Sequence, residues 1–542
     1  MSARESSWWR SAVVYQVYPR SFADADGDGV GDLAGVTSRL GHIASLGADA
    51  VWLTPFQRSP QADHGYDVSD YLDVDPLFGT LGDFDTLVER AHDLGMRVIV
   101  DLVPNHCSSA HPLFQAALEA GPGSPERARF HFSPGRGDGG ELPPNNWPSV
   151  FGGPAWSRVP ETDGRPGEWY LHLYAPEQPD LNWRHPATHE LLDGALRFWL
   201  DRGADGVRID VAHGLFKAEG LPDLADPDIE PMRLRGNVMA CDQEEVHEVY
   251  RRWRAIADGY VPERVLVGEV NLLPHRAARY VRPDELHQAF AFAFLAAPWD
   301  AEAWQVAATG LLDGAARTGS PVTWVVENHD VVRAPTRYGG GEHGLARARA
   351  ALLTVLALPG SAYVYQGQEL GLPEVDVPVE ARQDPAWLRS GVTRDGARVP
   401  IPWRSDPAGS YGFSDGAPGA TPWLPVPPPP EGTGRSGPHW GALSVAAQED
   451  DPSSTLELAR AAVQLRRRLH ADGVLHPDDS ATVRTTAAGL LEVERAGTLL
   501  AVNLGGAPSG LPEGELMLSS GPLARDGDLV LLPPDTAAWL RR

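Results

Sequence analysis

The sequence is poor in cysteine, in long apolar runs and in positive charge. Only two cysteines, Cys107 and Cys241, occur among its 542 residues, so no disulfide framework can form and at most one bond is available. No apolar run is long enough to span a bilayer, and the first residues, MSARESSWWRSAVVYQ, contain no apolar core of signal-peptide length. We therefore expect a cytoplasmic protein that does not associate with membranes.

Positively charged residues are fewer than negatively charged ones. The chain has 46 Lys and Arg against 73 Asp and Glu, which gives a formal net charge of −27. Nucleic acids and anionic membranes both bind through basic patches, so neither is expected as a partner. A neutral or cationic small molecule fits this charge better. A chain of this length is expected to hold one large domain with smaller satellites, as a monomer or a homo-oligomer.

Short apolar runs rich in β-branched residues alternate with helical patterns. Helical periodicity marks residues 82–95, 187–203 and 346–360. Eight apolar runs read as strands, at 13–19, 50–55, 97–106, 206–213, 265–271, 289–295, 323–330 and 362–369, although 289–295 (AFAFAFL) is also compatible with a helix. Eight strands that alternate with helices predict a closed (β/α)8 TIM barrel. No glycine-rich phosphate motif follows the first strand, which disfavours an open dinucleotide-binding sheet.

Two segments interrupt or follow the barrel pattern. A stretch of about seventy residues rich in Gly, Pro and Trp follows the third strand. A loop of roughly this length is usually functional or a small domain of its own. The tail has short strands broken by Gly and Pro, which is typical of an antiparallel domain. We therefore assign residues 1–103 and 177–470 to the barrel, 104–176 to an inserted domain and 471–542 to a C-terminal β-domain.

The stretch DADGDGVGDL, residues 24–33, places carboxylates at alternate positions. The side chains of Asp24, Asp26, Asp28 and Asp32 with the carbonyl of Val30 predict an oxygen cage for Ca²⁺ or Mg²⁺. A regulatory calcium loop is disfavoured, because its twelfth position would be Gly35 instead of a bidentate Glu. The remaining alternative is a solvated Gly/Asp-rich turn. We expect a structural cation and no organic cofactor.

Polar and charged side chains also cluster at the predicted strand ends. They are Asp101, Asn105 and His106 on the third strand, Arg208 and Asp210 on the fourth, Glu269 on the fifth, and His329 and Asp330 on the seventh. In such a barrel the chemistry lies at the carboxyl ends of the strands. A single carboxylate within an apolar strand can be structural, but four strands that deliver acids, Arg and His to one rim predict an active site.

These motifs resemble those of the α-amylase superfamily, glycoside hydrolase family 13, in its α-glucosidase and oligo-1,6-glucosidase branch. The resemblance covers about residues 8 to 470. The segments that carry it, in the family's order and spacing, are DLVPNH (101–106), GVRIDVAH (206–213), GEV (268–270) and ENHD (327–330), supported by HGYDV (64–68) and QPDLN (178–182).

The resemblance implies a role for each matching residue. Asp210 would be the nucleophile, Glu269 the general acid/base and Asp330 the carboxylate that stabilises the transition state. Arg208 would orient Asp210 and keep it ionised. The substrate-binding residues would be His106 and His329 for hydroxyls of the glucose, Asp67 and Arg333 for its far side, and Tyr66 as a stacking ring. Glu269 has no neighbouring cation in the sequence, so it is expected to be the protonated member of the pair.

We expect a retaining, exo-acting α-glucosidase that releases glucose from maltose and short maltooligosaccharides through a covalent glucosyl-enzyme intermediate. The alternatives are an oligo-1,6-glucosidase, a sucrose or trehalose hydrolase, a glucosyltransferase and a catalytically inert scaffold subunit. Val211 resembles α-1,6-preferring members, but VAHGLFK (211–217) departs from their pattern and strand packing explains a Val equally well. Glu327 either faces the outer layer of the barrel or alters the region beside Asp330.

Overall fold

The computed structural model describes residues 7–161, 166–230, 232–415, 417, 419–428 and 440–542. Its centre is a parallel barrel of eight strands: β1 (Val13–Val17), β2 (Ala50–Leu53), β5 (Arg97–Leu102), β9 (Gly206–Ile209), β10 (Val265–Gly268), β11 (Gln288–Ala289), β12 (Thr323–Val325) and β13 (Ser361–Tyr365). The hydrogen-bonded order runs from β11 through β10, β9, β5, β2, β1 and β13 to β12. A parallel bridge between Phe290 and Thr323 joins the two ends and closes the barrel. The predicted fold class is confirmed.

The strands form where the sequence has continuous apolar runs. Every residue of β1, β2, β9, β10, β12 and β13 is buried. Parallel strands read this way because helices cover one face and the barrel interior covers the other. The run at 289–295 is the exception, because only Gln288–Ala289 pair as β11 and Phe292–Leu295 form the helix α7. In so short a segment, the alternation of Phe with Ala is compatible with the periodicity of a strand and with that of a helix.

Helices surround the barrel, and local capping explains where several of them begin. The longer helices are α1 (Leu33–Leu46), α2 (Leu81–Asp93), α4 (Pro186–Asp201), α5 (Val246–Ala257), α8 (Ala301–Thr318), α10 (Gly341–Ala357) and α15 (Thr455–Ala471). Thr80 and Asp83 form a reciprocal capping box at α2, and Ser454 caps α15. None of the described helices combines the length and apolar character needed to cross a bilayer.

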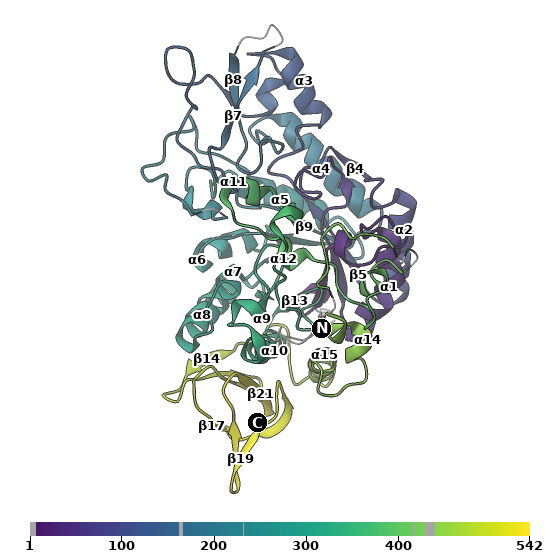
Figure 1. Ribbon diagram of the computed structural model, residues 1–542. Coiled ribbons are helices and arrows are strands. Elements are labelled where there is room, and N and C mark those ends of the chain that lie inside the picture. The colour runs from purple at the N-terminus through teal and green to yellow at the C-terminus, as the bar shows by residue number, and fades with distance from the viewer. Residues whose placement is uncertain (1–6, 162–165, 231, 416, 418, 429–439) are drawn as a thin grey trace.

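The segment between β5 and α4 forms a small unit at one end of the molecule (Figure 1). It contains α3 (Pro112–Ala120) and a three-stranded antiparallel sheet of β6 (Phe132–Ser133), β8 (Pro166–Leu171) and β7 (Trp156–Pro160). Trp147, Phe151 and Trp156 are buried in a separate hydrophobic cluster of this region. A bridge between His106 and Asp180 connects the unit to the barrel rim.

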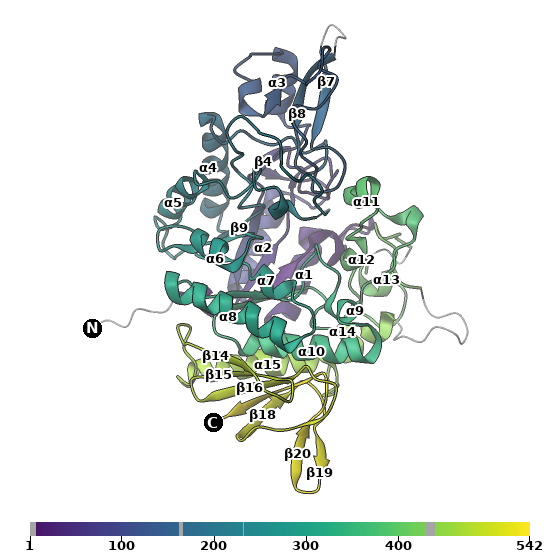
Figure 2. The same cartoon turned by 90° about the vertical axis from the view of Figure 1, so that its left-hand side faces the viewer.

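The C-terminal residues form two antiparallel sheets at the opposite end, as both views show (Figures 1 and 2). One sheet has β14 (Thr482–Thr485), β15 (Leu490–Arg495), β16 (Thr498–Asn503), β21 (Thr536–Arg541) and β18 (Glu515–Ser519), in that order. The other has β17 (Ser509–Gly510), β20 (Leu529–Leu532) and β19 (Ala524–Asp526). Asp535 accepts hydrogen bonds from Trp299 and Arg347, which fastens the sheets to the barrel helices.

Short elements fill the loops beside the strand ends and carry much of the site. They are the hairpin of β3 (Gln57–Arg58) and β4 (Asp70–Val74), and the helices α6 (Pro274–Ala277), α9 (Ala334–Arg337), α11 (Pro385–Ser390), α12 (Asp395–Arg398), α13 (Gly409–Gly412) and α14 (Val445–Gln448).

Candidate active site

A cavity of about 430 Å³ opens at the carboxyl ends of the barrel strands. Six of the residues predicted from the sequence lie in its wall: Tyr66, His106, Asp210, Glu269, His329 and Asp330. They come from the loops or strand ends after β2, β5, β9, β10 and β12. The barrel thus brings together acids and histidines that are far apart in the chain, at the rim where such folds place their chemistry.

Arg208 organises the acidic side of this cavity. Its Nη1 donates to Asp210 Oδ1 at 2.7 Å and to Asp101 Oδ1 at 2.9 Å. Its Nη2 donates to Glu269 Oε2 at 2.6 Å. One buried guanidinium therefore faces three carboxyl groups, which repel one another and cannot all be balanced by a single positive charge.

This excess of carboxyl groups over positive charge affects the pKa values of Asp210 and Asp101. Burial raises the pKa of Asp210 well above its usual range, because the Arg208 charge does not offset desolvation and the repulsion from Glu269 and Asp101. Burial likewise raises the pKa of Asp101 to about 7, against the attraction of Arg208. The sequence predicts that Arg208 keeps Asp210 ionised, and in the folded site Asp210 shares this guanidinium with Asp101 and Glu269.

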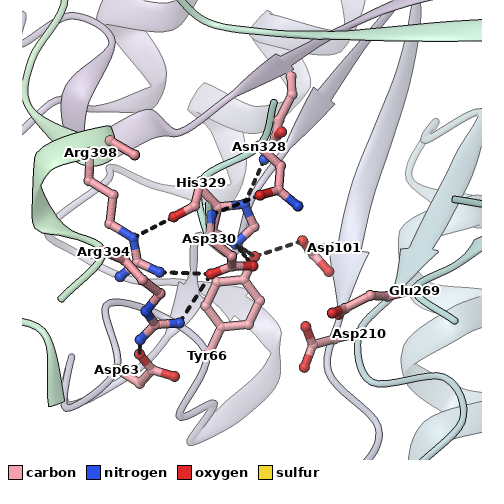
Figure 3. A network of polar contacts seen from close by, with 12 residues as sticks. Asp63, Tyr66, Asp101, Asp210, Glu269, Asn328, His329, Asp330, Arg394 and Arg398 are labelled. Atoms are coloured by element: carbon pink, nitrogen blue, oxygen red, sulfur yellow. Dashed lines mark hydrogen bonds and ion pairs between the residues drawn. The ribbon is translucent and has the colours of Figure 1, made fainter. Parts of the chain in front are cut away.

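Asp330 lies opposite this pair and has the reverse electrostatics (Figure 3). Its Oδ1 accepts hydrogen bonds from Arg394 Nη1 at 3.1 Å and Arg398 Nη2 at 3.0 Å. Burial disfavours its charge, but the attraction of these two arginines outweighs burial and holds the pKa of Asp330 well below its usual range. We call Arg394 and Arg398 the arginine clamp. The clamp provides a carboxylate that stays ionised at every physiological pH.

The two predicted histidines are neutral hydrogen-bonding groups. Burial lowers the pKa of His106 to about 3 and that of His329 to about 3. Gln16 Nε2 donates to Nδ1 of His329 at 2.7 Å, so the imidazole proton lies on Nε2, which faces the Tyr66 hydroxyl at 2.7 Å. The Tyr66 ring stacks on His329 with centroids 5.4 Å apart. Neutral donors and acceptors of this kind suit the hydroxyl groups of a sugar.

Val211 follows Asp210 and has a backbone conformation that is rare for its type. Its φ is 44°, in the left-handed region that a β-branched residue seldom adopts. This conformation directs its N–H to Glu269 Oε2 at 3.1 Å, while its side chain lines the cavity. Strain at such a position is typical of functional sites.

Two predicted substrate-binding residues lie behind the cavity wall and not in it. The carboxylate of Asp67 is fully buried and accepts the N–H groups of Ala62 and Asp63, each at 2.9 Å. The guanidinium of Arg333 donates to two backbone carbonyls, those of Gln366 at 3.0 Å and Ala397 at 2.9 Å. Both side chains are occupied in holding loops, so the prediction that they contact glucose directly requires correction.

Asp63 and Arg394 occupy the positions that were assigned to Asp67 and Arg333. Both line the cavity, and Arg394 Nη2 donates to Asp63 Oδ1 at 2.9 Å (Figure 3). Asp63 stands four residues before Asp67, just outside the motif HGYDV. Arg394 lies in an irregular loop after β13, where periodicity gives no signal. The spacing of two arginines in TRDGAR, residues 393–398, was the available clue.

The acidic loop before α1 partly matches the predicted cation site. Asp24, Asp26 and Asp28 offer carboxylate oxygens that all lie within 4.8 Å of one another, which fits the hard oxygen ligands that Ca²⁺ and Mg²⁺ prefer. Asp32 is different, because its Oδ1 accepts Gly35 N–H at 2.6 Å as the N-cap of α1 and its Oδ2 accepts Ala25 N–H at 2.8 Å. In the structure Asp32 is a helix cap and is not among the three clustered carboxylates.

The same loop supports the segment that follows the arginine clamp. Asp24 accepts a hydrogen bond from Ser414 Oγ at 2.5 Å and its N–H donates to Phe413 O at 2.9 Å. Trp423 N–H donates to Gly29 O at 2.9 Å. A cation held by the loop would thus fix the layer behind the cavity and take no part in bond cleavage.

Comparisons with known proteins agree with this site. A family model described as alpha amylase, catalytic domain, matches residues 16–472. The chain is 40% identical to a probable alpha-glucosidase of Rhizobium meliloti (strain 1021), over 85% of this chain and 83% of that protein. It is 33% identical to an oligo-1,6-glucosidase of Parageobacillus thermoglucosidasius, over 86% of this chain and 84% of the relative.

Two solved structures share the whole architecture. The crystal structure of an alpha-glucosyl transfer enzyme, XgtA, superimposes with a TM-score of 0.85 at 36% identity and covers 99% of this chain and 100% of that one. A trehalose-6-phosphate hydrolase of Bacillus licheniformis gives a TM-score of 0.81 at 28% identity, with 99% and 100% covered. The sequence motifs, the barrel, the paired acids and these matches lead to one assignment: the chain belongs to the α-amylase family of glycoside hydrolases.

Proposed function

We propose that the protein is a retaining, exo-acting α-glucosidase that releases glucose from the non-reducing end of maltose and short maltooligosaccharides. One observation carries the proposal: Asp210 and Glu269 bond to the same guanidinium in the wall of a cavity that the ionised Asp330 also lines. Two carboxyl groups around one sugar are the machinery of glycoside hydrolysis. The cavity, about 430 Å³, lies toward the small end of the range for ligand sites and suits short substrates.

The reaction follows from the placement of Asp210 and Glu269 on one guanidinium. Glu269 gives a proton to the glycosidic oxygen while an Asp210 oxygen bonds to the anomeric carbon, and the bond to the leaving group breaks. Water then attacks the same carbon, its proton passes to Glu269, and the bond to Asp210 breaks. Asp330 remains ionised and stabilises the positive charge that develops on the ring in both steps.

The proposal is tested with Asp210→Asn and Glu269→Gln on maltose and on p-nitrophenyl α-glucoside. Asp210→Asn should lose at least about 10³-fold in kcat on both substrates. Glu269→Gln should lose more on maltose than on the aryl glucoside, because nitrophenolate leaves without protonation. A variant pair that cleaves both substrates normally would exclude this machinery, whereas a wild-type protein that cleaves neither substrate would favour an inert scaffold role.

Linkage and acceptor preference form the second part of the proposal. A panel of maltose, isomaltose, sucrose, trehalose and maltotriose separates an α-1,4-glucosidase from an oligo-1,6-glucosidase or a sucrose or trehalose hydrolase. Glucosyl transfer is the alternative with structural support, because Phe292, Leu295, Val331 and Val332 give the cavity an apolar wall where an alcohol can compete with water. Chromatography of products formed with excess alcohol measures the share that is transferred.

We also propose that Asp24, Asp26 and Asp28, with the Val30 carbonyl, hold a structural Ca²⁺ or Mg²⁺ ion. Support comes from the convergence of three carboxylates, none of which forms an ion pair with a Lys, Arg or His side chain among the described residues. A cytoplasmic location, with the chain as a monomer or homo-oligomer, completes the proposal. Cell fractionation and light scattering test these two points.

A further inference from the structure

Glu327 and Arg333 stand on either side of the segment that carries His329 and Asp330. Both side chains are 1% exposed, and Arg333 Nη1 lies 3.6 Å from Glu327 Oε2. Glu327 Oε1 accepts the N–H of Ala334, the first residue of α9, at 2.9 Å, whereas Oε2 has no hydrogen-bond partner among the described residues. A buried carboxyl group with one oxygen unmatched is costly, so packing alone does not account for it.

Arg333 extends from this segment to the elements behind the arginine clamp. It donates to Gln366 O after β13 and to Ala397 O in α12, and its guanidinium lies 4.8 Å from the centroid of the Tyr365 ring. Tyr365 also donates to Ala397 O at 3.0 Å. Ala397 is flanked by the two clamp arginines, one residue before Arg398 and three after Arg394. The carbonyl that Arg333 holds therefore sets where α12 presents both guanidiniums.

We propose that Glu327 and Arg333 form a positioning pair that holds the arginine clamp against Asp330. The proposal rests on the α-glucosidase function proposed above, because it concerns the placement of that enzyme's third carboxylate. Neither residue is in the cavity wall, so neither touches the substrate. Their effect passes from the end of β12 through Arg333 to α12, and from the clamp to Asp330 and Asp63.

The charge of Glu327 makes this pair depend on pH. The charged groups that face Glu327 are Arg333, Arg337 and Glu374. Burial raises the pKa of Glu327 to about 7, and the two arginines and the Ala334 N–H only partly oppose it. As the pH rises through about 7, Glu327 becomes ionised and attracts Arg333. Below that pH the carboxyl group is neutral, and Arg333 keeps only its bonds to the two carbonyls.

The test compares Arg333→Lys and Glu327→Gln with a matched control, Glu285→Gln. Glu285 is also fully buried and pairs with Arg251 and Arg282, but it lies outside the cavity. Each variant is assayed on p-nitrophenyl α-glucoside from pH 5 to 9, and thermal unfolding is followed over the same range. Lys cannot reach both carbonyls as the planar guanidinium does, whereas Gln keeps the acceptor for Ala334 and removes only the charge.

Arg333→Lys should lower kcat by about tenfold or more with a smaller change in KM, because displacement of Asp330 weakens the transition state more than substrate binding. Glu327→Gln should remove a step near pH 7 from the profile of kcat. Glu327→Gln should also raise Tm at pH 8 relative to wild type, and by much less at pH 5. The pKa of Glu327 is higher in the folded than in the unfolded state, so wild type loses stability as the pH rises above the unfolded pKa, near 4, and the loss is complete above about pH 7.

For Glu327→Gln above pH 7, a rise in Tm together with a loss of kcat separates positioning from a structural role, which would move Tm and kcat in one direction. If Arg333→Lys fails to fold, the pH profile of Glu327→Gln decides the question. The proposal is overturned if both variants keep the kcat and pH profile of wild type. It is also overturned if Glu285→Gln shows the same changes as Glu327→Gln. A wild-type protein that cleaves no α-glucoside would instead overturn the proposed function, and this inference with it.

Discussion

Asp210 and Glu269, 59 residues apart in the chain, bond to opposite nitrogens of the same Arg208 guanidinium, at 2.7 and 2.6 Å. The residue that orients the proposed nucleophile therefore also fixes the proposed acid/base. A point charge could neutralise one of these carboxyl groups, but only a planar fork can hold both in a set relation.

Arg208→Lys is accordingly expected to behave as a loss of catalysis and not as a conservative change. We expect kcat/KM on p-nitrophenyl α-glucoside to fall by at least about 100-fold, because the two carboxyl groups lose their common anchor. Steady-state kinetics measures this. Arg264→Lys is the control, since Arg264 also pairs with a buried acid, Asp205, but away from the cavity. Equal effects of the two changes would contradict the anchoring role.

Asp330→Asn should abolish turnover at every pH from 5 to 9. The clamp lowers the pKa of Asp330, so its carboxylate contributes stability that is present above the unfolded pKa, near 4, and is lost only in strong acid. The Asn variant should therefore be less stable than wild type at pH 7 by about 1–3 kcal/mol, with a smaller difference below pH 3. Urea unfolding at the two pH values gives both quantities. A pH-independent difference would contradict the clamp.

Arg394→Lys should weaken the binding of the glucose ring itself. Arg394 joins Asp63 in the cavity wall and also contacts Asp330, so both KM and kcat are expected to worsen, with a loss in kcat/KM of about 10- to 100-fold. Inhibition by free glucose provides a readout that does not depend on turnover, and its Ki should rise. Normal glucose inhibition in this variant would argue that other groups bind the ring.

Removal of divalent cations should lower the melting temperature without changing the reaction. A chelator is expected to reduce Tm of the wild type, and added Ca²⁺ or Mg²⁺ to restore it by mass action. Asp26→Asn should lose this response. Asp32→Asn should keep it, because Asn remains a good N-cap for α1 and Asp32 is not part of the acidic cluster. A cation response that requires Asp32 and not Asp26 would reverse this assignment.

Sequence reasoning located the barrel and the paired acids because both depend on local patterns. Continuous apolar runs predicted the strands, and acids at strand ends predicted Asp210, Glu269 and Asp330. It predicted Asp67 and Arg333 as glucose-binding residues, whereas the structure places Asp63 and Arg394 in the cavity wall, in contact across 331 positions of the chain. No local pattern encodes such a contact. The sharing of Arg208 could not be predicted for the same reason, because Asp101 and Glu269 approach Arg208 only after folding.

The left-handed backbone conformation of Val211 makes two properties of the site depend on one residue. The side chain lines the cavity, and the N–H of the same residue donates a hydrogen bond to Glu269, the proposed acid/base. A replacement chosen to change which linkage is accepted also changes how readily the left-handed backbone is kept, and with it the hold on Glu269. A substitution of Val211 is therefore expected to change linkage selectivity and proton delivery by Glu269 together, so neither property can be engineered alone.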